Sequence, residues 1–168
     1  MEPVEHREPT ASRPDMAAYG VLPPDEGTGL LPWPWALERL ERSHDYWVAT
    51  VGPTGRPNVT PVWGVLMDGG LWFSCDPSSR KSRNLRERPD VTITTDDPQS
   101  PVIVEGRADL ADDRLAVQAF TATMNDKYEY QSPFEFFWAH DTWRVTPATA
   151  FGVEHDDFTG SPTRWRFS

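Results

Sequence analysis

The chain has 168 residues, of which 26 are acidic and 16 basic, and its formal net charge is −10. This length suits one domain with a substantial core, and the acidic balance argues against general nucleic-acid binding, which requires a basic surface. No apolar run approaches the roughly 18 residues of a membrane-spanning helix, and the Glu-, Pro- and Arg-rich start does not resemble a signal peptide. The single cysteine, Cys75, excludes an internal disulfide framework and predicts a reducing, cytoplasmic location.

The first 33 residues predict an extended N-terminal arm. Residues 1–15 are polar, charged and interrupted by prolines, so they have little to bury on their own. Residues 16–35 add apolar side chains, but repeated prolines disfavour a regular helix or strand. We therefore expect residues 1–33 to lie along a surface, such as that of a partner subunit, and residues 34–168 to form the folded domain. A short helix over residues 34–43, with proline near its first position, is expected to open that domain.

Strand-like segments follow in quick succession and predict a mainly β domain. Asp68-Gly69-Gly70 separates two apolar runs, which is a strong hairpin signal. The strand before this turn is apolar on both faces, one with Val59, Trp63, Val65 and Met67, the other with Val62 and Leu66. Such a strand suits a closed barrel packed against a second subunit, because a monomer would expose Trp63 and Val65. The expected strands are 46–51, 57–67, 71–75, 91–95, 101–110, 142–145 and 148–153, with a bulge or close backbone approach at Gly106 and a break at Pro147.

The helix expected after this hairpin begins in an unusual way. Ser78 and Ser79 can cap it, yet its first turn carries Arg80, Lys81 and Arg83. Cations there oppose the positive end of the helix dipole, at a cost of a few tenths to about 1 kcal/mol each when exposed. Free backbone N–H groups, serine hydroxyls and cationic side chains that meet at one point are suited to a phosphate group. The alternative is a solvated basic helix face that Ser79 merely caps.

A further helix is expected after Asp112, its predicted N-cap. Apolar residues recur at helical spacing and predict a core-facing side made of Leu115, Ala116, Ala119, Phe120 and Met124. The aromatic segment 125–139 is expected to be a loop with at most one helical turn.

No sequence pattern identifies a catalytic side chain. The three His-Asp pairs, which begin at His44, His140 and His155, lie far apart and lack the spacing of familiar zinc motifs, so no metal site is expected. Glycine-rich loops of the Rossmann and P-loop types are both missing from the sequence. A phosphate cradle without an obvious catalytic acid or nucleophile indicates that a bound organic cofactor carries out the chemistry.

Several short stretches of the chain form one ordered pattern: GRPNVTPVWGV, LWFS, SSRKSRNL, VEGRA and RVTP. This pattern resembles the pyridoxamine 5′-phosphate oxidase-like superfamily, and more narrowly its flavin/deazaflavin oxidoreductase branch, from about residue 46 to the C-terminus. The segments YGV, LLPWPW and TRWRF also resemble the group described as F420-dependent. TRWRF replaces the RLHDR-type motif that grips the substrate in true pyridoxamine phosphate oxidases, so a role in vitamin B6 synthesis is not expected.

This resemblance implies a split β-barrel with a few short helices, which forms a homodimer with two cofactor sites at its interface. It also implies an oxidoreductase that transfers a hydride between reduced F420 and a small organic substrate, with FMN as the alternative cofactor. Carried onto this sequence, the phosphate of the cofactor would contact Arg80, Lys81, Asn84, Ser74 and Ser79. The ring system would lie along Thr60, Pro61, Val62 and Trp63.

Two alternatives remain open. Beyond its phosphate, F420 continues into an anionic tail that FMN lacks. A row formed by Arg83, Arg86 and Arg88 would attract this tail and favour F420. Alternatively, Arg86 and Arg88 only complement the dipole at the helix C-terminus. A protein of another class would bind flavin or F420 without catalysis, or would bind haem through His44, His140 or His155.

Overall fold

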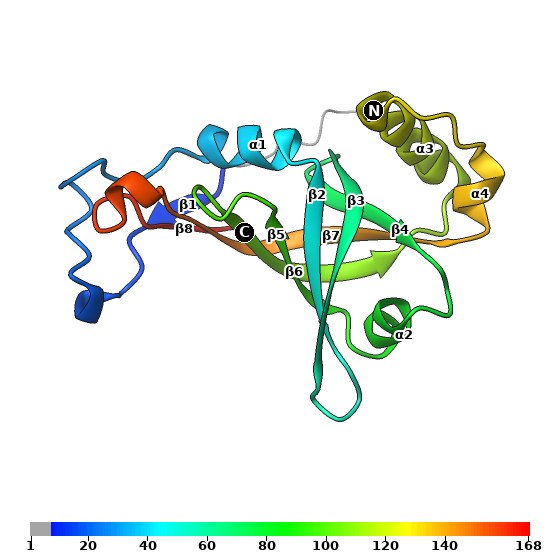
Figure 1. The fold of residues 1–168 in the computed structure, drawn as a ribbon, viewed down its shortest axis with the longest axis horizontal. Coiled ribbons are helices and arrows are strands. Elements are labelled where there is room, and N and C mark those ends of the chain that lie inside the picture. Colours follow the sequence, from blue (N-terminus) through cyan, green and yellow to red (C-terminus); the bar gives the residue numbers. More distant parts are fainter. Residues whose placement is uncertain (1–7) are drawn as a thin grey trace.

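The computed structural model describes residues 8–168, so residues 1–7 of the expected arm lie outside the described residues. The principal strands are β2 (Asp45–Val51), β3 (Pro57–Met67), β4 (Gly70–Cys75), β5 (Asp90–Thr95), β6 (Val102–Leu110) and β7 (Asp141–Gly152). Within the described range these six strands close an antiparallel barrel in the order β7-β4-β3-β2-β5-β6, since β6 pairs back onto β7 (Figure 1). Two short strands, β1 (Thr10–Ser12) and β8 (Thr163–Arg166), extend the sheet beyond β7. The expected mainly β barrel is confirmed.

The α-helices of residues 8–168 are α1 (Trp33–Arg42), α2 (Arg80–Glu87), α3 (Arg114–Tyr128) and α4 (Phe134–Trp138). Short 3-10 turns occur at η1 (Ala17–Tyr19) and η2 (His155–Asp157). In Figure 1, α3 and α4 lie together at one end of the molecule, while β1 and β8 lie toward the other. None of the helices within residues 8–168 combines the length and apolar character that a membrane span requires.

Helix α3 differs from its predicted form. Asp113, not Asp112, is the N-cap, because the Asp113 carboxylate accepts the Leu115 N–H at 3.0 Å. The predicted core side is wrong at Leu115, which is 73% exposed, and at Ala119, which is also exposed. The residues that α3 buries are Val117, Phe120, Thr121 and Met124. The segment 125–139 contains the expected short helix, α4, which follows directly after Pro133, but it holds more helix than expected because α3 continues to Tyr128.

The β3–β4 hairpin forms as predicted because its turn residues adopt left-handed backbone conformations. Asp68 and Gly69 have φ values of 50° and 69°, as a two-residue hairpin turn with positive φ at both positions requires. Met67 therefore pairs directly with Gly70, and β4 starts one residue earlier than the sequence pattern suggested.

Both faces of β3 are apolar, as predicted, but they have different partners. Val62 and Leu66 pack into the barrel core. On the outer face, Val65 is buried against the side chains of α3 and α4, so its expected exposure in a single chain is wrong. Val59 and Trp63 remain 54% and 43% exposed. The helices of the same chain thus cover one end of the outer face and leave the other end open.

Strand β7 runs unbroken through Pro147, where the sequence pattern predicted a break. Pro147 lies opposite Gly106, at the position where the β6–β7 register shifts between Glu105 and Gly106. Proline is tolerated at a bulge because its missing N–H interrupts no regular ladder bond. The close approach predicted at Gly106 is confirmed, since a Cβ atom there would lie 2.3 Å from the carbonyl oxygen of Thr146.

The described part of the N-terminal arm packs on its own chain. β1 pairs with β8, which the sequence analysis did not predict. Arg13 donates hydrogen bonds to the carbonyl oxygens of Pro162 at 2.6 Å and Gly160 at 2.8 Å. The backbone and hydroxyl of Thr28 both donate to the Asp157 carboxylate, at 2.7 and 2.6 Å. These contacts fasten the arm at the end of the barrel far from α3 and α4 (Figure 1).

Candidate functional site

An open hollow of about 690 Å³ lies between β3, β4, the start of α2 and the α3–α4 segment. Six of the nine residues expected at a cofactor site line it: Pro61, Val62, Trp63, Ser74, Ser79 and Lys81. The opposite wall comes from α3, α4 and their connection, and its aromatic members are Tyr128, Tyr130, Phe136, Phe137 and His140. The hollow thus has a polar, cationic side beside α2 and an aromatic side beneath α3 and α4.

The cationic side depends on how α2 begins. Ser79 is the N-cap, as predicted, and its hydroxyl oxygen accepts the Ser82 N–H at 3.3 Å. Lys81 is the one lysine or arginine among the described residues that line the hollow. One carboxylate, that of Asp76, lies nearby and accepts two hydrogen bonds from Ser78, which hold the pKa of Asp76 below its usual range. The local balance is therefore one ammonium and one carboxylate, together with serine hydroxyls.

An ion pair with a buried carboxylate fixes α2 in this position. Nη2 of Arg86 lies 2.6 Å from both carboxylate oxygens of Asp141, the first residue of β7. The Ser82 hydroxyl donates to the same carboxylate, which is buried. Positions 82 and 86 are four residues apart and therefore lie on one face of the helix. This face joins α2 to the barrel and so determines where Lys81 points.

Three of the expected site residues lie outside the hollow. The Asn84 side chain is buried and donates to the Thr50 hydroxyl at 2.9 Å, which ties α2 to β2. Arg80 lines a second, smaller hollow of about 350 Å³, together with Arg56 and Asn84 itself. Thr60 pairs with Val48, which faces the barrel interior, and its hydroxyl is buried without a hydrogen-bond partner among the described residues.

The row of arginines after Lys81 also lies outside the hollow, and each bonds to its own chain. Arg83 donates to the Ser78 carbonyl at 2.9 Å, and Arg88 donates to the Pro53 carbonyl at 2.9 Å. Arg86 is committed to Asp141. These three side chains do not form one groove that leads away from the hollow.

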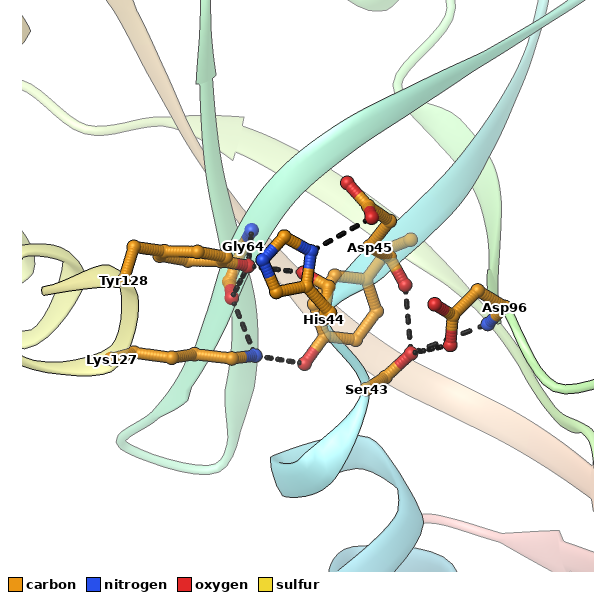
Figure 2. A network of polar contacts seen from close by, with 8 residues as sticks. Ser43, His44, Asp45, Gly64, Asp96, Lys127 and Tyr128 are labelled. Carbon is orange, nitrogen blue, oxygen red and sulfur yellow. Dashed lines mark hydrogen bonds and ion pairs between the residues drawn. The ribbon is translucent and has the colours of Figure 1, made fainter.

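The aromatic wall is built around a parallel stack of Trp63 on Tyr128, whose ring centroids are 4.5 Å apart with 4° between their planes. The Tyr128 hydroxyl accepts the Gly64 N–H at 2.9 Å and donates to the His44 carbonyl at 2.6 Å (Figure 2). Burial raises the pKa of Tyr128 to about 12, so the phenol stays protonated at neutral pH. Sequence analysis missed this wall because segment 125–139 was expected to be a loop, although its density of aromatic residues was a usable signal.

Two other lining residues carry potential chemistry. Burial raises the pKa of the Cys75 thiol, so this side chain is a poor nucleophile at neutral pH. His140 Nδ1 lies 2.6 Å from the Phe136 carbonyl oxygen, so Nε2 is the ring nitrogen that takes no part in this contact. Within residues 8–168, no three His, Cys, Asp or Glu side chains gather in a group able to hold a metal ion.

A hollow of about 460 Å³ between α1 and the β3–β4 turn offers a contrast. Its charged lining residues are Glu8, Glu41 and Asp68, with no lysine or arginine among the described lining. Such a surface repels anions. The hollow beside Lys81 is therefore the better candidate for a cofactor that carries a phosphate group.

Comparison with known proteins agrees with this geometry. Residues 35–151 match the family model described as pyridoxamine 5′-phosphate oxidase. The chain belongs to the pyridoxamine 5′-phosphate oxidase family. The matched residues span the barrel, α2 and the α3–α4 segment, so they include every element that lines the candidate hollow. No curated protein matches the chain significantly.

Several solved structures share the barrel. A conserved hypothetical protein from Mycobacterium tuberculosis aligns with a TM-score of 0.68 at 20% identity, over 74% of this chain and 86% of that one. An F420 reductase aligns with a TM-score of 0.57 at 27% identity, over 67% of this chain and 93% of that one. HutZ, the haem storage protein from Vibrio cholerae, aligns with a TM-score of 0.56 at 22% identity, over 68% and 88%. Structures with this barrel therefore include one named as a reductase and one named as a storage protein.

Proposed function

We propose that this protein binds a deazaflavin of the F420 type in the hollow beside Lys81 and is an oxidoreductase that transfers a hydride between reduced F420 and a small organic substrate. The observation that carries this proposal is the two-sided lining of the hollow, with an ammonium, serine hydroxyls and one carboxylate on one side and aromatic rings on the other. A planar ring system with a phosphate group matches both sides. The similarity to an F420 reductase at 27% identity supports the same conclusion.

The protein's own residues would bind and orient the cofactor rather than react with it. Lys81 and the hydroxyls of Ser74 and Ser79 would hold the phosphate through charge-assisted hydrogen bonds. Pro61, Val62 and Trp63 would lie along the ring system, and the aromatic wall would exclude water from the reacting face. When bound, the deazaflavin itself supplies the hydride chemistry.

The direct test is to incubate the protein with F420 or FMN, remove free cofactor by desalting, and record absorbance and fluorescence. Retention of F420, together with oxidation of reduced F420 by an added acceptor in the presence of the protein, would support the proposal, whereas retention of neither cofactor would refute it. Lys81→Ala should weaken cofactor binding about tenfold or more, because it removes a charge-assisted bond in a partly buried site. Arg88→Ala is the matched control, since it removes the same charge outside the hollow and should leave the affinity unchanged.

F420 differs from FMN in its anionic tail, so a preference for F420 requires further cations, beyond Lys81, that can contact this tail. Of the three arginines expected for this role, Arg86 and Arg88 bond elsewhere, whereas Arg83 lines the neighbouring hollow with Arg56, Arg80 and one carboxylate residue, Glu87. The side chains of Arg56 and Arg80 make no hydrogen bond or ion pair within the described part of the chain. We therefore expect F420 to bind more tightly than FMN at moderate salt, and Arg80→Ala to narrow the gap. Tighter binding of FMN would support the alternative of an FMN-dependent oxidoreductase. A larger loss of FMN binding with Arg80→Ala than with Lys81→Ala would place the phosphate in the second hollow.

Haem binding is the second candidate function, and one observation favours it: His140 lines the hollow with Nε2 available. His155 does not line the hollow, and the Nδ1 atom of His44 lies 2.8 Å from Asp45. Titration with haem would give a Soret band that His140→Ala abolishes if this function is correct. A Soret band unaffected by that change, or none at all, would exclude His140 as a haem ligand.

We further propose that the protein forms a homodimer through the exposed apolar strip on the outer face of β2 and β3. Trp47, Val59 and Trp63 belong to this strip and are each more than 40% exposed. Trp47 pairs with Pro61, and Ala49 with Val59, so these residues are contiguous across the two strands. A continuous apolar face of this kind is typical of a protein–protein interface.

A further inference from the structure

Lys127 lies behind the aromatic wall of the hollow, in the last turn of α3, and does not itself line the hollow. Its ammonium donates to the Gly64 carbonyl in β3 at 2.9 Å and to the Tyr46 hydroxyl in β2 at 2.8 Å (Figure 2). The Tyr46 hydroxyl in turn donates to the Leu40 carbonyl in α1. One side chain therefore connects α3 with both strands behind the aromatic wall.

Tyr128, the next residue, binds the same peptide groups of β3. Gly64 donates its N–H to the Tyr128 hydroxyl while its carbonyl oxygen accepts from Lys127. The register of β2 and β3 ends at the pair Asp45–Trp63, so Gly64 lies one residue beyond the last strand partner. Two side chains of α3 thus bond the peptide groups of Gly64 where β2 no longer does. Figure 2 shows both side chains reaching this point from the same helix.

We propose that Lys127 is a positioning residue for the candidate site: by joining the last turn of α3 to Gly64, it holds Tyr128 in its stack with Trp63 and so fixes the wall of the hollow. Its ammonium also lies 4.6 Å from the centre of the Tyr46 ring and 5.3 Å from that of Tyr128, within range of cation–π attraction. The effect of this wall on cofactor affinity rests on the proposed function, but the positioning itself does not.

The charge of Lys127 makes this arrangement sensitive to pH. No ion pair within residues 8–168 involves Lys127, so its bonds are to neutral oxygens. Burial lowers the pKa of Lys127 to about 8, although Asp96 and Asp45 oppose this shift from longer range. The titratable groups around this network are Tyr46, Tyr128, Asp45, Asp96, Glu41 and His44. Above pH 8 the amine keeps two N–H donors but loses the charge that strengthens its bonds and attracts both rings, so the wall is held less firmly.

The positioning is testable without a cofactor by fluorine NMR of protein labelled with 5-fluorotryptophan, in which Trp63→Phe identifies the Trp63 resonance. Lys127→Met keeps the length of the side chain but removes its donors, and the Trp63 resonance should shift. In a His44→Gln background, which removes the neighbouring imidazole, this resonance should move with a midpoint near pH 8, and Lys127→Met should abolish the step. An unshifted resonance in Lys127→Met, or a step that persists in it, would overturn the proposal. If Lys127→Met does not fold, the pH titration of the protein that retains Lys127 decides. A Trp63 resonance that does not shift near pH 8 in that protein refutes the proposal.

Cofactor affinity supplies the second readout. Lys127→Met should weaken the binding of F420 or FMN about fivefold, equivalent to about 1 kcal/mol, although Lys127 does not line the hollow. Arg107→Met, which removes an exposed cation of β6, is the matched control and should change neither the affinity nor the Trp63 resonance. If neither cofactor binds the wild-type protein, the proposed function fails and the fluorine resonance alone decides the role of Lys127. If a cofactor binds equally well to Lys127→Met while the resonance is unmoved, the positioning role is refuted and the proposed function stands.

Discussion

Replacing Arg86 with alanine should destabilise the fold rather than change the choice of cofactor. The guanidinium of Arg86 contacts both carboxylate oxygens of Asp141 at 2.6 Å, and among residues 8–168 the Ser82 hydroxyl is the other side-chain donor to that carboxylate. Asp141 is only 6% exposed. Arg86→Ala would therefore leave a buried carboxylate with a single hydroxyl partner.

The size of the effect follows from the burial of the two groups. Removing one partner of a fully buried ion pair costs about 3–5 kcal/mol, because the remaining charge is left unpaired. The side chain of Arg86 is 48% exposed, so solvent screens part of the interaction and water can reach the vacated position. We therefore expect a loss of about 2 kcal/mol in the free energy of unfolding, or a fall of about 4–8 °C in Tm for a domain of this size.

Urea denaturation at pH 7 measures this loss in Arg86→Ala, Asp141→Asn and the double variant. The double variant should be more stable than the sum of the single effects predicts, because a neutral amide at position 141 needs no counter-charge. Arg88→Ala is the control, since its guanidinium donates to an exposed carbonyl of Pro53. Equal stability of Arg86→Ala and Arg88→Ala, or strictly additive effects in the double variant, would refute this reasoning.

The remaining predictions concern assembly, backbone packing and pH. Light scattering should give twice the 19.1 kDa chain mass, and Val59→Glu should give the mass of one chain, while a wild-type mass of 19.1 kDa would contradict the proposed dimer. Gly106→Ala should lower Tm strongly or prevent folding, as circular dichroism would detect, because a Cβ atom there meets the Thr146 carbonyl at 2.3 Å. Folding lowers the pKa of Lys127 from 10.5 to about 8, so between these values the unfolded state binds more protons than the folded state. The free energy of unfolding should therefore rise between pH 8 and 10. The raised pKa of Tyr128 should make the free energy of unfolding fall again above pH 10. If the urea midpoint of Lys127→Met rises between pH 8 and 10 as much as that of the wild type, Lys127 is excluded as the cause.

Features that depend on local chemistry could be predicted from the sequence. Asp68 and Gly69 specify the hairpin turn by themselves, because few other residues accept positive φ at both positions. Ser79 caps α2 through a bond to a residue three positions along the chain. The two-faced apolar pattern of residues 57–67 suits a closed barrel, and the resemblance to the family adds that this barrel is of the split type.

Features that depend on distant partners could not be predicted. The continuity of β7 through Pro147 requires the bulge of a different strand, and its partner Gly106 lies 41 positions earlier in the sequence. The aromatic residues of segment 125–139 have no clear period, because some pack on the outer face of β3 while others, such as Tyr130 and Phe136, remain exposed at the rim of the hollow. Sequence periodicity reveals a helix that buries one stripe, but it does not reveal a wall shared between a core and a cavity.

The cations of α2 illustrate the same limit and bear on which ligand the site accepts. Adjacent residues of a helix point about 100° apart, so a basic run on one helix is distributed among several surroundings. Arg86 faces Asp141, Arg80 faces the second hollow, and Lys81 faces the hollow beneath the aromatic wall. An anion in that hollow therefore meets one ammonium and serine hydroxyls beside the carboxylate of Asp76, so the hollow accepts a single phosphate group at most. A longer polyanion would gain from Arg56 and Arg80 only where it leaves the hollow along α2, so the difference in affinity between F420 and FMN should depend on Arg80 and not on Arg86.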